Sequence, residues 1–319
     1  MSARGDLVPN LKGLWEKLDT RLFGPADTRL CAWLRIGFGI LATINLGLLA
    51  ADMELWFGET GAVPYEAGRD SIDPDTRTLF SLLPKTGPGL VACGWLMVAS
   101  GVMLTLGLFS RVNAALVFVW MASVQHRNLL LFDGEDIFFR LFAFFLVFLP
   151  IGARWSVDAW RRKQPPPERA GSSWALYLIR IQLVLIYFST AWLKLSGEEW
   201  LDGSAMWYVT HLEDTFDRVA LPAFLTEPLW VLKTTGWLVV TVEAWLVIGL
   251  WFRKTRRFSI ALGIALHLAL ELTMNLFLFE WLMMLGLTSF LRGDEIAFWK
   301  RRKKAPASEE AGESVETVL

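Results

Sequence analysis

The polar side chains that stand inside otherwise apolar stretches are the residues with the clearest potential for chemistry. Glu243 lies near the middle of "GWLVVTVEAWLVIGLW", and His267 and Glu271 lie in "GIALHLALELTMN". An ionisable side chain at such a depth costs a few kcal/mol on membrane-insertion scales, so it requires a partner or a function. Glu243 is therefore expected to be protonated or to pair with a cation or donor from another helix.

His267, Glu271 and Asn275 follow one another at intervals of four residues, which places them on one face of a helix. A histidine and a glutamate one turn apart could supply two metal ligands. Because no further histidine or cysteine lies nearby in the sequence, a buried hydrogen-bonded cluster is the favoured interpretation and no metal site is predicted. The predicted polar cluster comprises Glu243, His267, Glu271 and Asn275.

Lys194 stands almost at the end of another apolar run, in "YFSTAWLKLSGEEW". Arg180, Tyr187 and Lys194 are spaced by seven and fall along one stripe of the predicted helix, with Thr190 one turn before the lysine. By position alone, Lys194 is an interfacial anchor that reaches the headgroups, and the same snorkelling explains Arg35 near the end of its own run.

The residues around Lys194 leave a second interpretation open, in which this lysine is a base. Apolar rings around an amine favour its neutral form, whereas nearby carboxylates favour the charged form. Glu198, Glu199 and Asp202 all follow Lys194 closely. If the two glutamates fold back over the amine they keep it charged, and if they point to water the amine can serve as a base.

The elements that must position these residues are long apolar helices. Hydrophobic residues make up 54% of the 319 positions and the mean hydropathy is +0.40, which is too apolar for a soluble domain of this size. An all-α integral membrane protein of about eight transmembrane helices is predicted. The predicted segments are 30–51, 89–107, 111–131, 136–152, 173–195, 229–252, 257–276 and 277–291, with the last turn held by residues 277–281.

The distribution of basic residues tests this number of helices independently. If the N-terminus is cytoplasmic, the predicted inner connections and termini hold 21 of the 31 lysines and arginines, and the outer connections hold five. Every second connection is basic, as the positive-inside rule requires for an even number of helices. Both termini are therefore predicted to be cytoplasmic, and the protein to be a multi-pass component of the plasma membrane.

Three regions are predicted along the chain. Residues 1–27 form an amphipathic surface helix, since apolar side chains recur there at helical spacing. Residues 28–291 form the transmembrane domain, whose outer loops 52–88 and 196–228 are long enough to be functional. Residues 292–319 form a basic and then disordered tail. The apolar residues of the first region are Leu11, Leu14, Trp15, Leu18 and Leu22.

The net charge and the two cysteines indicate which binding partners and which covalent links to expect. The formal net charge of −1 gives no indication of a nucleic-acid partner, so the lipid bilayer is the predicted surrounding. Cys31 and Cys93 are interpreted as two buried thiols rather than a disulfide or a metal site.

The string "YFSTAWLKLSGEEWLDGSAMWYV" resembles the HTTM domain, the membrane part shared by vitamin K-dependent γ-carboxylases and many bacterial proteins. That family has an aromatic pair, small residues, a lysine, a polar turn and then Trp-x-x-Gly. The further matches follow in the same order along 28–291 as in the family: Arg35, "FGETGAVP", "RWSVDAW" and His267. The residues of the string itself are Tyr187, Phe188, Lys194, Trp200 and Gly203.

The resemblance implies a role for each of these positions. In the carboxylases the lysine is thought to deprotonate vitamin K hydroquinone, so Lys194 would be the general base and a vitamin K-like quinol the cofactor. Tyr187, Thr190, Trp200 and His267 would line the cofactor site on the outer side of the membrane.

The chain departs from the carboxylases in two respects. No large extramembrane region follows residue 291, and Glu135 or Asp136 stands where the carboxylases use a histidine. Three functions therefore stay open. The first is a quinol-dependent enzyme that abstracts protons and carboxylates. The second is a non-catalytic or partner-dependent factor that matures or exports a secreted peptide. The third is a proton-coupled transporter, which usually shows inverted repeats that this sequence lacks.

Overall fold

A computed structural model describes residues 7–64, 78–129, 134–212, 216, 218–219 and 221–296. Within these residues the chain is mostly helical and has almost no strands. The bounds of the elements are α1 Leu7–Phe23, β1 Ala26–Asp27, α2 Thr28–Ala51, α3 Met53–Phe57, a 3₁₀ turn Leu79–Ser81, α5 Gly87–Leu106, α6 Ser110–Arg127, α7 Gly134–Phe148, α8 Val157–Arg161, β2 Arg169–Ala170, α9 Trp174–Leu195, α10 Glu198–Asp202, α11 Ala205–Thr210, α12 Ala223–Thr226, α13 Leu229–Gly249, α14 Arg256–Thr273, α15 Phe279–Thr288 and α16 Gly293–Ile296.

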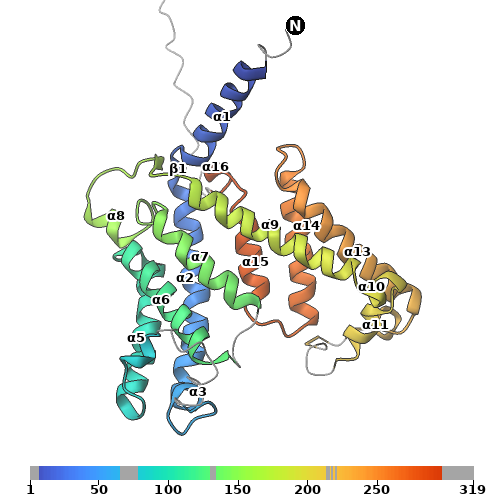
Figure 1. The fold of residues 1–319 in the computed structure, drawn as a ribbon, viewed down its shortest axis with the longest axis horizontal. Coiled ribbons are helices and arrows are strands. Elements are labelled where there is room, and N and C mark those ends of the chain that lie inside the picture. The colour runs from blue at the N-terminus through green and yellow to red at the C-terminus, as the bar shows by residue number, and fades with distance from the viewer. Residues whose placement is uncertain are drawn as a thin grey trace, which may run out of the picture.

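The helices pack in two groups that meet along α2, α7, α9 and α15 (Figure 1). In the first group α2 packs on α5, α5 on α6, and α6 on α7. In the second group α9 packs on α13, α13 on α14, and α14 on α15. The groups join where α7 contacts α9 and where α15 contacts α2. The short helices α10 and α11 continue from the end of α9 at one edge, and α1 extends away from the bundle (Figure 1).

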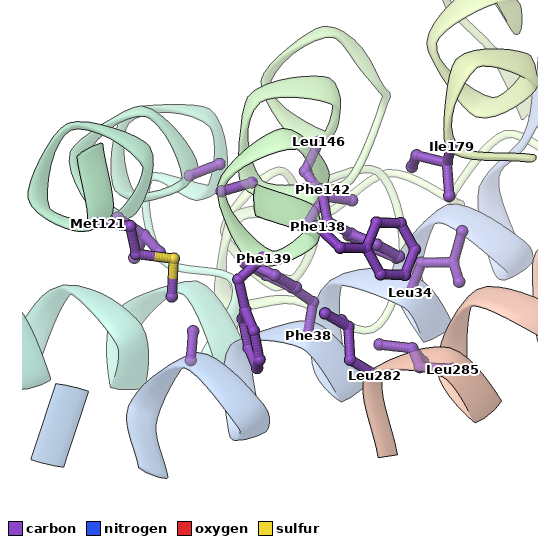
Figure 2. Close-up of a cluster of buried hydrophobic side chains, with 14 of the residues drawn as sticks. Leu34, Phe38, Met121, Phe138, Phe139, Phe142, Leu146, Ile179, Leu282 and Leu285 are labelled. Carbon is purple, nitrogen blue, oxygen red and sulfur yellow. The ribbon is translucent and has the colours of Figure 1, made fainter. Parts of the chain in front are cut away.

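The apolar core lies at this junction (Figure 2). Phe38 of α2 stacks on Phe142 of α7 with ring centroids 5.0 Å apart, and both rings are fully buried. Leu282 of α15 and Ile179 of α9 extend the same cluster into the second group. Because all four helices bury side chains in one cluster, the two groups form a single core.

Small residues let α2 and α5 approach each other closely. A Cβ on Gly39 would lie 2.8 Å from the Cα of Thr105, and a Cβ on Gly101 would lie 3.1 Å from the Cα of Thr43. The first distance is too short for a Cβ atom and the second is tighter than an ordinary Cβ contact, so these glycines allow the two backbones to approach closely. Close contact at small residues is typical of helices packed within membranes.

Local caps fix where several helices begin. The Asp27 side chain accepts hydrogen bonds from the backbone N–H groups of Arg29 and Leu30 at the start of α2. Asp158, from α8, accepts hydrogen bonds from the N–H groups of Phe109 and Ser110 and from the Ser110 hydroxyl, all at 2.7–2.8 Å. Burial opposes ionisation of Asp158, but these hydrogen bonds outweigh it and lower the pKa of the carboxyl.

Each of the eight predicted apolar segments coincides with a helix of the structure: α2, α5, α6, α7, α9, α13, α14 and α15. Four of them are long and apolar enough to cross a membrane, namely α2, α5, α9 and α13. The all-α prediction is thus confirmed, while eight spans with both termini inside stays a prediction. The final turn lies at residues 274–278, slightly before the expected position, and passes through Phe277 at a φ of 54°.

The structure tests the predicted N-terminal helix and the predicted state of the cysteines, but not the predicted tail. Residues 7–23 are helical, and Trp15 and Leu18 in this helix are exposed. The tail from residue 297 and the loop stretch 65–77 lie outside the described residues. Cys31 is buried, Cys93 is half-buried, and both thiols are free.

A candidate proton-transfer site

Lys194 and Glu243 form an ion pair between α9 and α13. The Lys194 Nζ lies 2.5 Å from Oε1 of Glu243, and the two side chains are 22% and 8% exposed. Glu243 therefore meets the expectation that it pairs with a cation from another helix. The pair forms although Lys194 lies in the last turn of its helix, because the long lysine side chain reaches back to Glu243.

The acids that follow Lys194 in the sequence are not its ion-pair partner. Glu198 and Glu199 begin α10 and have exposed side chains. Trp200 of the same short helix instead places its ring 5.1 Å from Nζ, in a cation–π contact. Lys194 is thus held by one buried carboxylate and one aromatic ring.

A second polar group joins α9, α14 and α15. The Tyr187 hydroxyl lies 2.6 Å from Nε2 of His267, and Nδ1 of His267 contacts a carboxylate oxygen of Glu280. Tyr187 is 2% exposed, His267 3% and Glu280 0%. The arrangement of a hydroxyl, an imidazole and a carboxylate in a row is the one used to orient and charge an imidazole in hydrolytic triads.

The structure divides three acidic or imidazole residues of the predicted polar cluster among separate sets of partners. Glu243 pairs with Lys194, and His267 binds Tyr187 and Glu280. Glu271 pairs with Arg218, which also donates a hydrogen bond to the Glu271 carbonyl. The expectation that Asn275 shares the helix face is wrong, because α14 ends at Thr273 and Asn275 is exposed in the turn that follows.

Thr190 and Arg35, which the sequence also singles out, have partners in the structure. The Thr190 hydroxyl donates to the backbone carbonyls of its own helix, at Ile186 and Tyr187. Arg35 is fully buried, so snorkelling is the wrong explanation for it. Its guanidinium donates to the carbonyls of Thr105, Ile151, Arg154 and Trp155, and it thereby ties α2 to the end of α5 and to the α7–α8 connection.

The structure also brings in two residues that the sequence reading left out. Glu280 was assigned to a turn, where an acid needs no partner, yet it lies in the first turn of α15 and is completely buried. Arg218 lies in a long loop, where the sequence indicated only that it is one of the basic residues of the predicted outer connections. The position of Glu280 beside an apolar segment was the one feature of the sequence that could have indicated its burial.

One carboxylate oxygen of Glu243 is left over from these contacts. The Glu243 Oε2 atom is buried and has no hydrogen-bond partner among the described residues. Trp200 supplies an aromatic face beside the amine. No group of three or more His, Cys, Asp or Glu able to hold a metal occurs in the described part of the chain.

Apolar helices of membrane-crossing length, joined by buried ion pairs, define a helical membrane protein. The model of the HTTM domain matches residues 23–294, most of the chain, and the chain therefore belongs to the HTTM domain family.

A curated relative is an uncharacterized protein, YitO of Bacillus subtilis (strain 168). It is 27% identical over 158 residues, which cover 46% of this chain and 50% of that protein. The chain thus matches about half the length of this relative. No solved structure matches the chain.

Proposed function

We propose that this protein is a membrane enzyme in which Lys194 removes a proton from a quinol. The single observation that carries the proposal is the Lys194–Glu243 pair, in which a half-buried amine is held against a carboxylate by residues of two helices. The resemblance to the vitamin K-dependent γ-carboxylases supports the proposal, because the lysine of the matching string is thought to be the base in those enzymes.

The pair offers a way to present an unprotonated amine at low energetic cost. A proton that moves along the hydrogen bond from Nζ to Oε1 turns ammonium and carboxylate into amine and carboxylic acid, and the pair stays neutral. The amine of Lys194 then accepts a proton from the bound hydroxyl.

The quinol, when bound, supplies the acidic hydroxyl and the reducing electrons. Lys194 would accept the proton while Glu243 keeps its own proton on Oε1, so the positive charge would be balanced by the deprotonated hydroxyl, and Trp200 would hold the ammonium by its ring face. Oε2 of Glu243 is available to orient the hydroxyl. Carboxylation of a substrate glutamate is the further step that the family resemblance suggests.

The proposal includes eight membrane spans with both termini on the cytoplasmic side of the plasma membrane. Four helices meet the length and hydropathy of a span, and the other four fill the positions expected from the alternation of basic connections. Labelling of single cysteines placed at residues 59 and 164 from either side of sealed vesicles tests this topology. Opposite accessibility is expected, and equal accessibility from one side contradicts it.

Two experiments test this function. The protein is purified from membranes and analysed by mass spectrometry for a bound quinone. Its oxygen-dependent oxidation of vitamin K hydroquinone and of menaquinol is then measured in nanodiscs. Lys194→Met should lower turnover by about 100-fold or more, the range of a lost general base. Glu243→Gln should lower it as well. Lys233→Met, a lysine at the corresponding end of α13, is the matched control and should keep the parent rate.

The outcomes separate the candidate functions. Full turnover in Lys194→Met overturns the role of the base. If the parent protein neither binds a quinone nor oxidises a quinol, the function as a factor for a secreted peptide becomes the better explanation. Proton uptake into vesicles without quinol oxidation supports the transporter.

A further inference from the structure

A cavity of about 550 Å³ lies where the turn between α5 and α6 meets α8 and the segment that precedes β2. Its lining comes from two stretches that are far apart in the sequence, within residues 109–112 and 150–171. Arg111 at the start of α6 and Arg162 directly after α8 both belong to this lining. Lys194 and its partners do not line the cavity, so it is a site separate from the one described above.

Hydrogen bonds to the rest of the fold hold one wall of the cavity in place. The prolines 165–167 form this wall. The Thr28 hydroxyl donates to the Pro167 carbonyl at 2.5 Å, and Arg154 donates to the Pro166 carbonyl at 3.1 Å. Directly after this segment, β2 pairs with β1. The wall is thus tied to the start of α2, and the cavity is formed before any ligand binds.

Positive charge dominates the cavity. Residues 109–112 and 150–171 together contain six lysines and arginines and two acids. Arg111 is exposed and forms no hydrogen bond or ion pair within the described part of the chain. Arg162 donates to the Gly152 carbonyl through one nitrogen, which leaves other N–H groups of its guanidinium available. Two arginines from different elements therefore offer donors to one cavity, an arrangement that suits a phosphate group.

Asp158 is the acid in the lining, and its oxygens are already in use. They accept hydrogen bonds from the N–H groups of Phe109 and Ser110 and from the Ser110 hydroxyl. The start of α6 is capped in this way, so recognition of an anion depends on the arginines rather than on the helix terminus. The lining keeps an excess of positive charge, because it contains two arginines and one carboxylate.

The cavity lies beside apolar side chains at the end of a membrane-crossing helix. Helix α5 is long and apolar enough to span a membrane, so the turn that ends it at Gly107 lies near a membrane surface. Phe109 and Val112 line the cavity and are both more than half exposed. Trp160 of α8 is also exposed, and tryptophan is typical of the membrane interface. An anion with an apolar tail fits these surroundings.

We propose that this cavity binds an anionic phospholipid, with Arg111 and Arg162 on its phosphate group and Phe109 and Val112 against its acyl chains. Basic pockets at the membrane surface of helical proteins recognise lipid headgroups through the same combination of charge and apolar contact. The volume of about 550 Å³ is that of an ordinary ligand pocket. The proposal is independent of the function proposed for Lys194, because the two sites share no residue.

Binding of phosphatidylglycerol to the purified protein in neutral micelles tests the site, with native mass spectrometry across a titration of the lipid. The double variant Arg111→Gln, Arg162→Gln should weaken binding by about 30-fold, since each arginine contributes about fivefold toward an anionic lipid. The matched control is Arg253→Gln, Lys254→Gln, which removes the same charge from the exposed connection between α13 and α14. This connection and α8 lie on opposite sides of the bundle (Figure 1). The control should bind within about twofold of the parent, because salt screens distant surface charges.

Further ligands separate a lipid from other anions. Phosphatidylcholine should bind at least tenfold more weakly than phosphatidylglycerol, and so should glycerol 1-phosphate, which carries the phosphate without acyl chains. Equal binding of either compound overturns the proposal, as does an equal loss in the double variant and its control. Circular dichroism checks that each variant is folded. If the double variant is not folded, Arg111→Gln alone should weaken binding by about fivefold, because the Arg111 side chain has no partner in the described fold, and unchanged binding overturns the site.

Discussion

Removal of the Lys194 amine should destabilise the protein far more than removal of the whole ion pair. In Lys194→Met, the Glu243 carboxylate keeps its burial at 8% exposure but loses its cation, and its Oε2 has no other partner among the described residues. Breaking a buried pair in this way costs about 3–5 kcal/mol, and the 22% exposure of Lys194 places the expected value near the lower end, at about 3 kcal/mol.

The double variant Lys194→Met, Glu243→Leu replaces both charges by apolar groups of similar volume. Its unfolding free energy should lie within about 1 kcal/mol of the parent, so the two substitutions should be coupled by about 2 kcal/mol or more. Unfolding in mixed micelles, followed by circular dichroism against denaturant concentration, gives the unfolding free energy of the parent, the two single variants and the double variant.

The exposed pair Arg29–Glu168 provides the matched control. Its atoms lie 3.7 Å apart and the Glu168 side chain is 85% exposed, so Glu168→Gln should change stability by less than about 1 kcal/mol. If Lys194→Met costs no more than this control, or if the double variant is as unstable as the single one, the pair is not the buried and mutually dependent unit described above.

Three further outcomes are expected from other contacts. Asp158→Ala should lower the unfolding free energy by about 1–2 kcal/mol, because Asp158 caps α6. Because folding lowers the pKa of Asp158, this contribution is present above the unfolded pKa of about 3.9 and is lost as the pH falls through the folded pKa. Measuring stability against acid pH checks this. Arg35→Met should cost about 3 kcal/mol in chemical unfolding, since several buried carbonyls lose their donor, and a change below 1 kcal/mol would contradict that role. Arg218→Gln should cost about 1 kcal/mol in thermal unfolding, and Glu271→Gln in the same chain should reverse most of this loss.

The helices themselves could be predicted from the sequence because their signal is local. A run of about 20 apolar residues is helical in a membrane whatever its neighbours are, since its backbone hydrogen bonds must be satisfied within the segment. The boundaries of α2, α9 and α13 therefore follow the predicted segments closely. Turns were harder to place, because Thr273 ends α14 where the apolar pattern would allow another turn of helix.

The need for partners could also be predicted, although their identity could not. A carboxylate at the depth of Glu243 requires a cation or donor from another helix, and this follows from the energetics of burial alone. The choice of Lys194 depends on how α9 packs on α13, which no spacing within one segment encodes. The same limit explains why Glu271 was grouped with His267 although its partner is Arg218.

The order of residues is enough to predict an all-α membrane protein with ionisable residues that cannot face lipid, and its motif singles out Lys194. The packing of the helices was needed to show that Glu243 holds this lysine, that Arg35 is buried and joins helices, and that Glu280 completes a triad with Tyr187 and His267. The two kinds of feature differ because helix formation depends on neighbours along the chain. The charge state of a buried group instead depends on whichever side chains other helices bring within hydrogen-bond distance.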